Sequence, residues 1–397
     1  MPSPPSPRLV VPALGVTQIL AWGSSYYLPT VLAKPIAADT GWPLTSVVAG
    51  LSIGLLIAGL ASPLVGRKIH SLGGRPVLAA SALLIATGQL VLAVSPSLPI
   101  FIAGWIVLGF GMSAGLYDAA FSTLGRLYGQ AARHHITTLT LFGGLASTAC
   151  WPLSAFLVSE LGWRGTCAVY AAIHLGFSLP LHLSTLRGPL PDWDAEERAN
   201  QRDREPARHT GLIFLTLAAA IMIGSMLSTI ISVHILTILQ DKGIALAAAV
   251  GLGALVGPSQ VGARFIEMLV SRYHHPIWTK VASVSLVALG LGLLWAEAPI
   301  IPLALVCYGA GIGLESIARA TLPLALFGVA DYAPIMGRLA RPSLIAQAAS
   351  PSIGALLIER LGTESALAVV VGVALFNVVL TLFLFARTWP RTNPSSH

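Results

Sequence analysis

The sequence has few charged residues: Asp, Glu, Lys and Arg together make up 10% of its 397 positions, against about 25% in soluble proteins. The 42 residues between Arg75 and Asp118 contain none of the four, and similar uncharged runs recur along the chain. A helix that crosses a bilayer core of about 30 Å needs roughly 20 apolar residues. With 55% hydrophobic residues, this pattern excludes a water-soluble fold and predicts an all-α, multi-pass integral membrane protein.

Cysteine is also scarce. The three cysteines (Cys150, Cys167 and Cys307) all fall in apolar segments, and none has the close Cys or His spacing of a zinc or redox site. The chain carries no hydrolase triad, and its glycine-rich run at 309–313 lacks the Lys and Ser/Thr of a phosphate loop. We therefore expect no catalytic residues, metal, cofactor or nucleotide. The net charge of +7 comes from basic residues scattered over loops, so we expect no nucleic-acid partner.

Apolar runs bounded by loop signals predict twelve transmembrane helices. They lie near 10–33, 45–65, 76–94, 98–124, 135–158, 165–186, 211–239, 246–271, 277–296, 299–324, 334–358 and 362–386. An even number places both termini on one side of the membrane, and most of the Lys and Arg residues fall in loops or tails on that side. The positive-inside rule then predicts cytoplasmic termini. We expect a bacterial inner (plasma) membrane.

Short motifs repeat at an offset of about 200 residues, which indicates an internal duplication. Ala38-Asp-Thr-Gly41 is echoed by Gln240-Asp-Lys-Gly243, and Leu161-Gly162 by Leu361-Gly362. Gly111 and Gly115 are matched with Gly309 and Gly313. We therefore expect two pseudo-symmetric six-helix bundles, a transporter architecture with its site at the interface of the halves. The predicted parts are an N-terminal tail (1–9), a bundle (10–186), a charged cytoplasmic linker (187–210), a second bundle (211–386) and a C-terminal tail (387–397).

This pattern resembles the major facilitator superfamily of secondary transporters. The loop between the second and third helices carries part of the family signature in Gly66, Gly73 and Arg75, although the signature's Asp position holds His70. Arg67 lies in the same loop. The resemblance implies that this loop gates one end of the transport cleft. The family's helix 4 arginine position is Trp105, and Pro152 lacks the glycine of many exporters, so the motifs assign no branch of the family.

Few ionisable residues lie inside the predicted spans, and such residues are functional by default. Asp118 has small neighbours on its helix face and is a candidate for proton exchange. The alternative for Asp118 is a fixed ion pair, for which Arg126 is the candidate partner. Glu315 and Arg319 are four residues apart, the favourable spacing of a helical ion pair. Their pair is either structural or a switch in which Arg319 releases Glu315 to bind an anionic substrate.

The resemblance also implies that helices 1, 4, 7 and 10 line a central cavity. Helix 1 carries a polar-aromatic stripe, and helices 7 and 10 add polar groups. The candidate substrate-cavity residues are Gln18, Trp22, Tyr26, Ser228, His234 and Tyr308. The alternative for the serines is hydrogen bonding between helices, and for His234 a place at the membrane interface.

Together these features predict a secondary active transporter that moves a small organic solute by alternating access, with proton coupling. A small organic anion fits Arg319. One alternative is an exporter of amphipathic or toxic compounds, because Asp118 and the aromatic stripe suit a cation; arsenical export would rest on Cys150. Another alternative is a transport-silent receptor on the same fold. The predicted partners are the small-molecule substrate, protons and the lipid bilayer.

Overall fold

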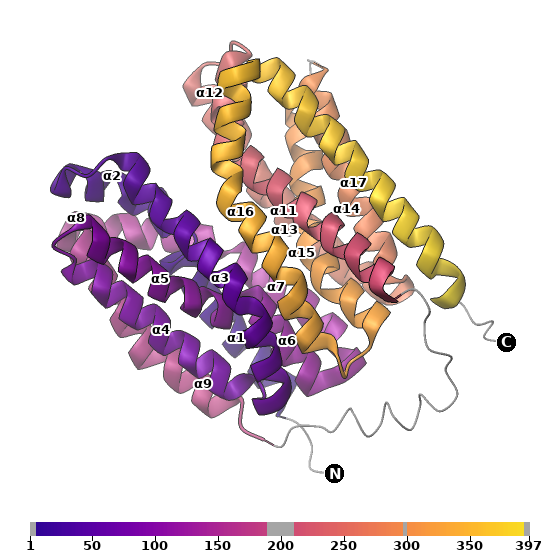
Figure 1. Cartoon of the computed structure of the whole chain (residues 1–397), viewed down its shortest axis with the longest axis horizontal. Coiled ribbons are helices and arrows are strands. Elements are labelled where there is room, and N and C mark those ends of the chain that lie inside the picture. Colours follow the sequence, from indigo (N-terminus) through magenta and orange to yellow (C-terminus); the bar gives the residue numbers. More distant parts are fainter. Residues whose placement is uncertain (1–4, 189–209, 297–299, 393–397) are drawn as a thin grey trace. The chain divides into compact units, whose positions relative to one another are not determined.

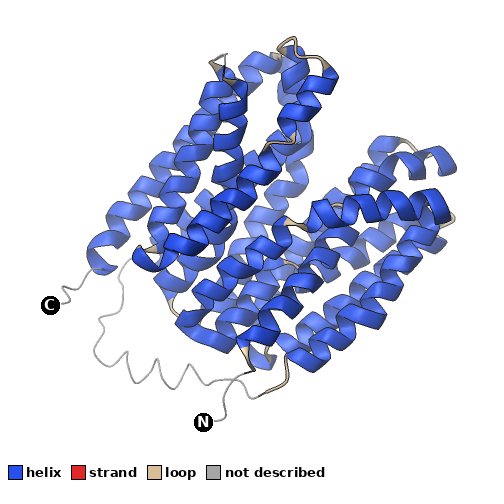
Figure 2. Ribbon diagram, turned by 180° about the vertical axis from the view of Figure 1, so that it is seen from behind, coloured by secondary structure: helices blue, strands red, loops and turns tan. Residues whose placement is uncertain are grey.

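The computed structural model describes residues 5–188, 210–296 and 300–392, and every regular element within these ranges is a helix (Figures 1 and 2). The chain divides into two compact units. Unit 1 is Met1–Ala199 with Phe327–Ala348, and unit 2 is Asn200–Leu326 with Ala349–His397. The charged linker predicted at 187–210 falls almost wholly outside the described residues.

Unit 1 is built from the helices of the first half of the chain. They are α1 (Pro7–Ser24), α2 (Leu28–Thr40), α3 (Leu44–Leu72), α4 (Gly74–Val94), α5 (Leu98–Gly115), α6 (Tyr117–Tyr128), α7 (Ala132–Gly144), α8 (Ala146–Ile173), a π-helical turn (His174–Ser178) and α9 (Leu179–Thr185). The first part of α16 (Tyr332–Leu361) also belongs to this unit. Its core includes Phe101, Trp105 and Trp163, which pack with leucines of α2.

Unit 2 contains the remaining described helices. They are α11 (Thr210–Asp241), α12 (Leu246–Gly253), α13 (Val256–Val270), α14 (Pro276–Trp295), α15 (Ile301–Phe327, of which the last residue is grouped with unit 1), the rest of α16, and α17 (Thr363–Thr392). Leu227, Leu291 and Tyr308 are buried in its core, where α11, α14, α15 and α17 meet.

All twelve predicted spans are helical, but several consist of two helices. The span at 10–33 is α1 followed by α2, the span at 98–124 is α5 followed by α6, and the span at 246–271 is α12 followed by α13. Conversely, α8 runs from the predicted fifth span into the sixth through a kink at Gly162, whose φ is 67°. In the described ranges, eight helical stretches are long and apolar enough to cross a membrane.

The motifs that repeat in the sequence contact each other in the same way in both units. In unit 1, Trp163 Nε1 donates a hydrogen bond to Asp39 Oδ2 over 2.8 Å. In unit 2, Thr363 Oγ1 donates to Asp241 Oδ2. Asp39 and Asp241 each precede a glycine of positive φ by two residues: Gly41 (69°) and Gly243 (81°). The two donors each directly follow another such glycine: Gly162 (67°) and Gly362 (77°). The shared contact supports an internal duplication.

Helix packing corrects the register of the repeat in α5 and α15. A Cβ at Gly109 would lie 2.6 Å from a carbonyl of α3, and one at Gly309 would lie 2.7 Å from a carbonyl of α13. Gly111 likewise packs on α4, and Gly311 on α14. Gly109 therefore corresponds to Gly309 and Gly111 to Gly311, so the predicted match of Gly111 with Gly309 was wrong by two residues. Glycines recur every two residues in α15, which makes two registers equally plausible from sequence.

Candidate functional site

A buried ion pair lies at the centre of unit 2, and the sequence pattern had suggested only one of its members. Lys280 is in the second turn of α14 and is 0% exposed. Its Nζ donates to Glu315 Oε1 of α15 over 2.5 Å and lies 3.5 Å from the Ala220 carbonyl of α11. Burying two charges is costly unless they pair and their remaining hydrogen bonds are satisfied. Here the three helices supply both the counter-charge and further partners.

The expected partner of Glu315 was Arg319, one turn along the same helix. The structure bonds Glu315 to Lys280 and Ser283 of α14, two partners that the sequence pattern did not indicate. An ion pair between two helices neutralises both charges in the interior, whereas the pattern within one helix says nothing about a neighbouring helix; the pairing of Glu315 with Arg319 stays a prediction. Arg319 has interactions of its own and is not an unpartnered charge.

Ser283 of α14 links the side chain of Glu315 to the backbone of α15, the helix that carries Glu315. Its Oγ lies 2.9 Å from Glu315 Oε2 and 2.9 Å from the Gly311 carbonyl oxygen. A hydroxyl has one proton to donate and lone pairs with which to accept. If Glu315 is ionised, the hydroxyl can donate to only one of these two acceptors at a time. If Glu315 is protonated, it can donate to Ser283 while Ser283 donates to Gly311.

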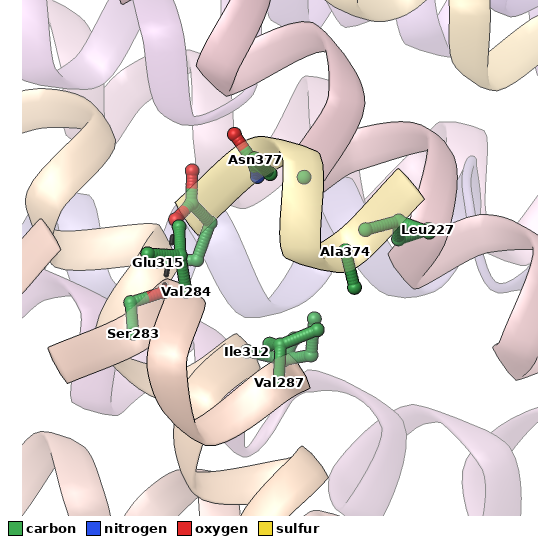
Figure 3. A pocket seen from close by; sticks show the side chains of 9 residues that line it. Leu227, Ser283, Val284, Val287, Ile312, Glu315, Ala374 and Asn377 are labelled. Atoms are coloured by element: carbon green, nitrogen blue, oxygen red, sulfur yellow. Dashed lines mark hydrogen bonds between the residues drawn. The ribbon is translucent and has the colours of Figure 1, made fainter. Parts of the chain in front are cut away.

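A small cavity adjoins the carboxyl of Glu315 (Figure 3). Its volume is about 10 Å³, roughly the space that one water molecule requires. Its lining includes Leu227 of α11, Ser283 of α14 and Asn377 of α17. Asn377 is 3% exposed, and its Oδ1 has no hydrogen-bond partner among the described residues. The cavity is therefore large enough for a water beside the carboxyl and too small for an organic solute.

Asp118 in unit 1 lies at a break in a membrane helix. Leu116 between α5 and α6 is extended (φ −81°, ψ −170°), and α6 begins at the next residue, so Asp118 is in its first turn. The break removes the helical partner of the Gly115 carbonyl oxygen, to which Gln18 Nε2 donates over 2.6 Å. Freed backbone groups within a membrane need such partners. The predicted residues Gln18 and Asp118 are thus brought to one place, the two sides of this break.

A second break separates α1 from α2 and is stabilised in the same way. The Ser24 carbonyl oxygen accepts from Gln89 Nε2 of α4. The Ser24 hydroxyl lies 2.7 Å from Nε2 of His174, which opens the π-helical turn. Gln89 and His174 are buried polar residues that sequence reasoning missed, because an isolated Gln or His in an apolar run has no spacing that marks it.

Aromatic side chains gather beside the two breaks. The Trp22 ring centroid lies 5.2 Å from that of Tyr26, 6.0 Å from that of Tyr27 and 5.1 Å from that of Tyr117. Tyr117 directly precedes Asp118. We call this group, extended by one ring contact at each end, the aromatic cluster: Trp22, Tyr26, Tyr27, Tyr117, Phe121 and Trp151. Two of the three predicted helix 1 residues, Trp22 and Tyr26, therefore lie in one aromatic group with Tyr117, the residue before Asp118.

The remaining predicted cavity residues lie in unit 2. Tyr308 Oη donates to the Ser228 carbonyl oxygen over 3.2 Å, so α15 and α11 bring these two predicted residues together. His234 Nε2 lies 3.1 Å from the Pro351 carbonyl oxygen, and its ring packs against Gly354 of α16. His234 is thus held between helices. In unit 1, Cys150 is buried with its Sγ 3.5 Å from the Ile19 carbonyl oxygen.

The signature loop joins α3 to α4 in unit 1. A Cβ at Gly66 would lie 2.4 Å from the Ala333 carbonyl oxygen of α16, and Gly73 makes the turn with a φ of 77°. Arg75 Nε donates to the Leu183 carbonyl oxygen over 3.1 Å. Arg67 is exposed and His70 half-buried. Both signature glycines therefore have a structural requirement for glycine.

Metal-binding groups are not a feature of the described ranges: no cluster of three or more His, Cys, Asp or Glu side chains occurs in them. Polar sites in these ranges include the ion pair of unit 2 and the helix breaks of unit 1.

Comparisons with known proteins agree with this architecture. The model of the Major Facilitator Superfamily matches residues 14–338. No curated protein matches the sequence. Among solved structures, the human organic anion transporter MFSD10 (TETRAN) is 18% identical, with a TM-score of 0.70 and coverage of 95% of this chain and 100% of that one.

Two sugar symporters are similar in fold. The proton:xylose symporter XylE is 11% identical (TM-score 0.71; 98% of this chain and 96% of that one). The E. coli fucose:proton symporter FucP is 12% identical (TM-score 0.71; 94% and 98%). The chain therefore shares the fold of these transporters. It belongs to the Major Facilitator Superfamily, and as a member of that family it is a multi-pass integral membrane transporter and not an enzyme.

Proposed function

We propose that this transporter is secondary active, and that it moves a small organic solute by alternating access coupled to protons. The observation that carries the proposal is the position of Ser283 Oγ, 2.9 Å from both Glu315 Oε2 and the Gly311 carbonyl oxygen. With Glu315 ionised, its carboxylate and the Gly311 carbonyl oxygen compete for the one hydroxyl proton of Ser283. With Glu315 protonated, Glu315 can donate to Ser283 while Ser283 donates to Gly311. The site thus accommodates a carboxyl group that gains and loses a proton.

The charge balance of the pair suggests the class of substrate. With Glu315 ionised, the pair with Lys280 is neutral; with Glu315 protonated, the positive charge of Lys280 loses its counter-charge. An uncompensated charge in a low-dielectric interior is unfavourable. An anionic solute arriving with the proton would restore neutrality, and Arg319 adds a cation one turn along α15. We therefore propose proton-coupled transport of a small organic anion.

Asp118 is the proposed proton-exchange group of unit 1. It lies in the first turn of α6, directly after the break at Leu116. Gln18, Trp22 and Tyr26 beside it are the proposed solute contacts of this unit. Ser228, His234 and Tyr308 are those of unit 2.

The solved structures of similar fold are compatible with this proposal. XylE and FucP are described as proton symporters and MFSD10 as an organic anion transporter. At 18% identity or less, these similarities concern the fold; the argument for protons and anions rests on the residues above. We further propose a bacterial inner-membrane location with both termini cytoplasmic, with the loop from Gly66 to Arg75 as a gate.

Export of an amphipathic cation is the second candidate function. The aromatic cluster next to Asp118 favours it, because aromatic faces and a carboxylate together attract organic cations. In that case Asp118 would contact the solute, and Glu315 would retain the proton-exchange role.

The two candidates are separated by proton flux in liposomes that contain a pH-sensitive dye. The purified protein is challenged with small carboxylates and, separately, with amphipathic cations. Matched variants are Glu315→Gln, Asp118→Asn and, as a control, Glu364→Gln, which changes an exposed acid at the start of α17. We expect carboxylates to elicit a flux that Glu315→Gln abolishes and Glu364→Gln preserves.

A flux elicited by cations and lost in Asp118→Asn would favour the exporter. Flux that persists in both Glu315→Gln and Asp118→Asn would refute coupling through these residues. Binding of a labelled solute without flux or counterflow would indicate a transport-silent receptor.

A further inference from the structure

A cavity unrelated to the ion pair lies in unit 1 at the ends of several helices. Its volume is about 400 Å³, and it is bounded by the turn from α3 to α4, the last part of α6 and the end of α9. Its lining is mostly apolar: Leu72, Pro76, Leu127, Leu183 and Leu186. Helices that are long enough to span a bilayer end at its surface. The cavity is therefore at the depth of lipid headgroups and the first part of their acyl chains.

Arg75 lines this cavity, and Arg187 lies in the chain between two lining residues, Leu186 and Gly188. Arg75 Nε and Arg187 Nε donate to the same acceptor, the Leu183 carbonyl oxygen, over 3.1 and 3.0 Å. The two Nε atoms are therefore no more than about 6 Å apart. Neither guanidinium has a carboxylate partner within the part of the chain that the structure describes. Each uses only its Nε in these bonds, and its Nη groups remain as donors.

We propose that this cavity binds a membrane lipid with an anionic phosphate headgroup. The phosphate would lie between the Nη groups of Arg75 and Arg187, because guanidinium groups bind phosphate through paired N–H donors. An anion there would relieve the repulsion between two adjacent cations. Basic pockets between membrane helices on the cytoplasmic side are suited to such headgroups.

The apolar lining favours a lipid over free phosphate. A phosphate ion would use only the two arginines and leave the leucine-lined space empty or wet. A lipid would also bury part of an acyl chain against Leu127, Leu183 and Leu186. The site includes Arg75 of the signature loop, so the bound lipid would contact the turn between α3 and α4. This inference does not depend on the proposed proton coupling.

Lipid retention measured by native mass spectrometry tests the inference. The full-length protein in detergent is titrated with phosphatidylglycerol, with phosphatidylcholine of the same acyl chains, and with glycerol 3-phosphate. The variant is Arg75→Gln/Arg187→Gln. The matched control is Lys68→Gln, which removes an exposed cation near the same end of α3 that does not line the cavity.

We expect one tightly retained phosphatidylglycerol per protein. Its affinity should fall at least about tenfold in the double variant, since each lost pair of charge-assisted hydrogen bonds contributes on that order, and remain unchanged in Lys68→Gln. Unfolding temperature, measured in parallel without lipid, shows whether the double variant is folded. The proposal would be overturned if phosphatidylcholine were retained as well as phosphatidylglycerol. It would also be overturned if Lys68→Gln lost as much affinity as the double variant, or if glycerol 3-phosphate bound as tightly as the lipid.

Discussion

At the scale of single residues, Lys280 and Glu315 are each other's counter-charge in the interior of unit 2. Replacing one of them leaves a buried unpaired charge, so Lys280→Met should lower the free energy of unfolding by about 3–5 kcal/mol. The double variant Lys280→Met/Glu315→Gln should recover much of that loss, because no charge remains. Thermal unfolding in detergent is measured for the unsubstituted protein, Lys280→Met, Glu315→Gln and the double variant.

The control for this pair is Glu364→Gln, which should be nearly neutral because Glu364 is exposed. If the effects of the two single substitutions simply add in the double variant, Lys280 and Glu315 do not stabilise each other, and the role assigned to the pair is wrong.

Gln18 offers a second test at the same scale. Gln18→Met keeps the volume but removes the donor to the Gly115 carbonyl oxygen, which would leave a buried acceptor unsatisfied at a cost of about 1–3 kcal/mol. Gln240→Met, at an exposed glutamine of α11, is the matched control. Equal unfolding temperatures for the two variants would show that the break in α5–α6 does not depend on Gln18.

Residue patterns in the sequence located the acids of the site but not their partners. Asp118 and Glu315 are conspicuous because acids are rare inside apolar spans. Lys280 is not among the predicted site residues, and it lies three residues after the predicted start of its span at 277. Its burial depends on Glu315 of α15 and Ala220 of α11, which come from elsewhere in the chain. Contacts of that kind are set by helix packing, which no local spacing encodes.

At the scale of helices, close packing of α3 on the first part of α16 depends on Gly66. In Gly66→Ala, the added Cβ would lie 2.4 Å from the Ala333 carbonyl oxygen, and backbone cannot move aside as a side chain can. We expect a loss of about 1–3 kcal/mol, the usual cost of overpacking. Gly262→Ala in α13 meets nothing within 4 Å and should gain up to about 1 kcal/mol through helix propensity. Unfolding temperatures of the two variants give the comparison, and losses of the same size would contradict it.

The helix boundaries show what hydropathy can and cannot predict. Apolar runs located all twelve spans, because the length of a span is set by the bilayer. They did not predict the breaks at Ser25 and Leu116, since each break lies inside a run that is apolar enough overall to be predicted as one span. These breaks depend on distant glutamines, Gln89 and Gln18, which satisfy the freed carbonyl groups.

At the scale of the whole molecule, the internal duplication could be inferred from the sequence because the residues that mark it are glycines required by the backbone conformation. Glycines with positive φ follow Asp39 and Asp241 by two residues, and few other residues adopt that conformation. Regions without such markers, such as the glycine-rich part of α15, left the register ambiguous.

The proposed topology predicts which parts of the protein face each side of the membrane. In a Cys307→Ser background, the remaining Cys150 and Cys167 are buried. Ser6→Cys and Glu160→Cys then introduce single exposed thiols near opposite ends of the bundle. A membrane-impermeant maleimide added to intact spheroplasts should label Glu160→Cys and leave Ser6→Cys unlabelled until the cells are opened. The reverse pattern would invert the proposed orientation.

The ion pair of unit 2 also constrains how the protein is made. Lys280 is synthesised 35 residues before Glu315, so α14 leaves the ribosome with an uncompensated cation. A lone lysine in a membrane helix is unfavourable, by up to about 2.5–3.5 kcal/mol at the helix centre, and the cost for Lys280 ends only when α15 arrives. Insertion of α14 and α15 together, as a helical hairpin, avoids the unpaired intermediate. Glu315 would then be needed during biogenesis before it is used in any transport cycle.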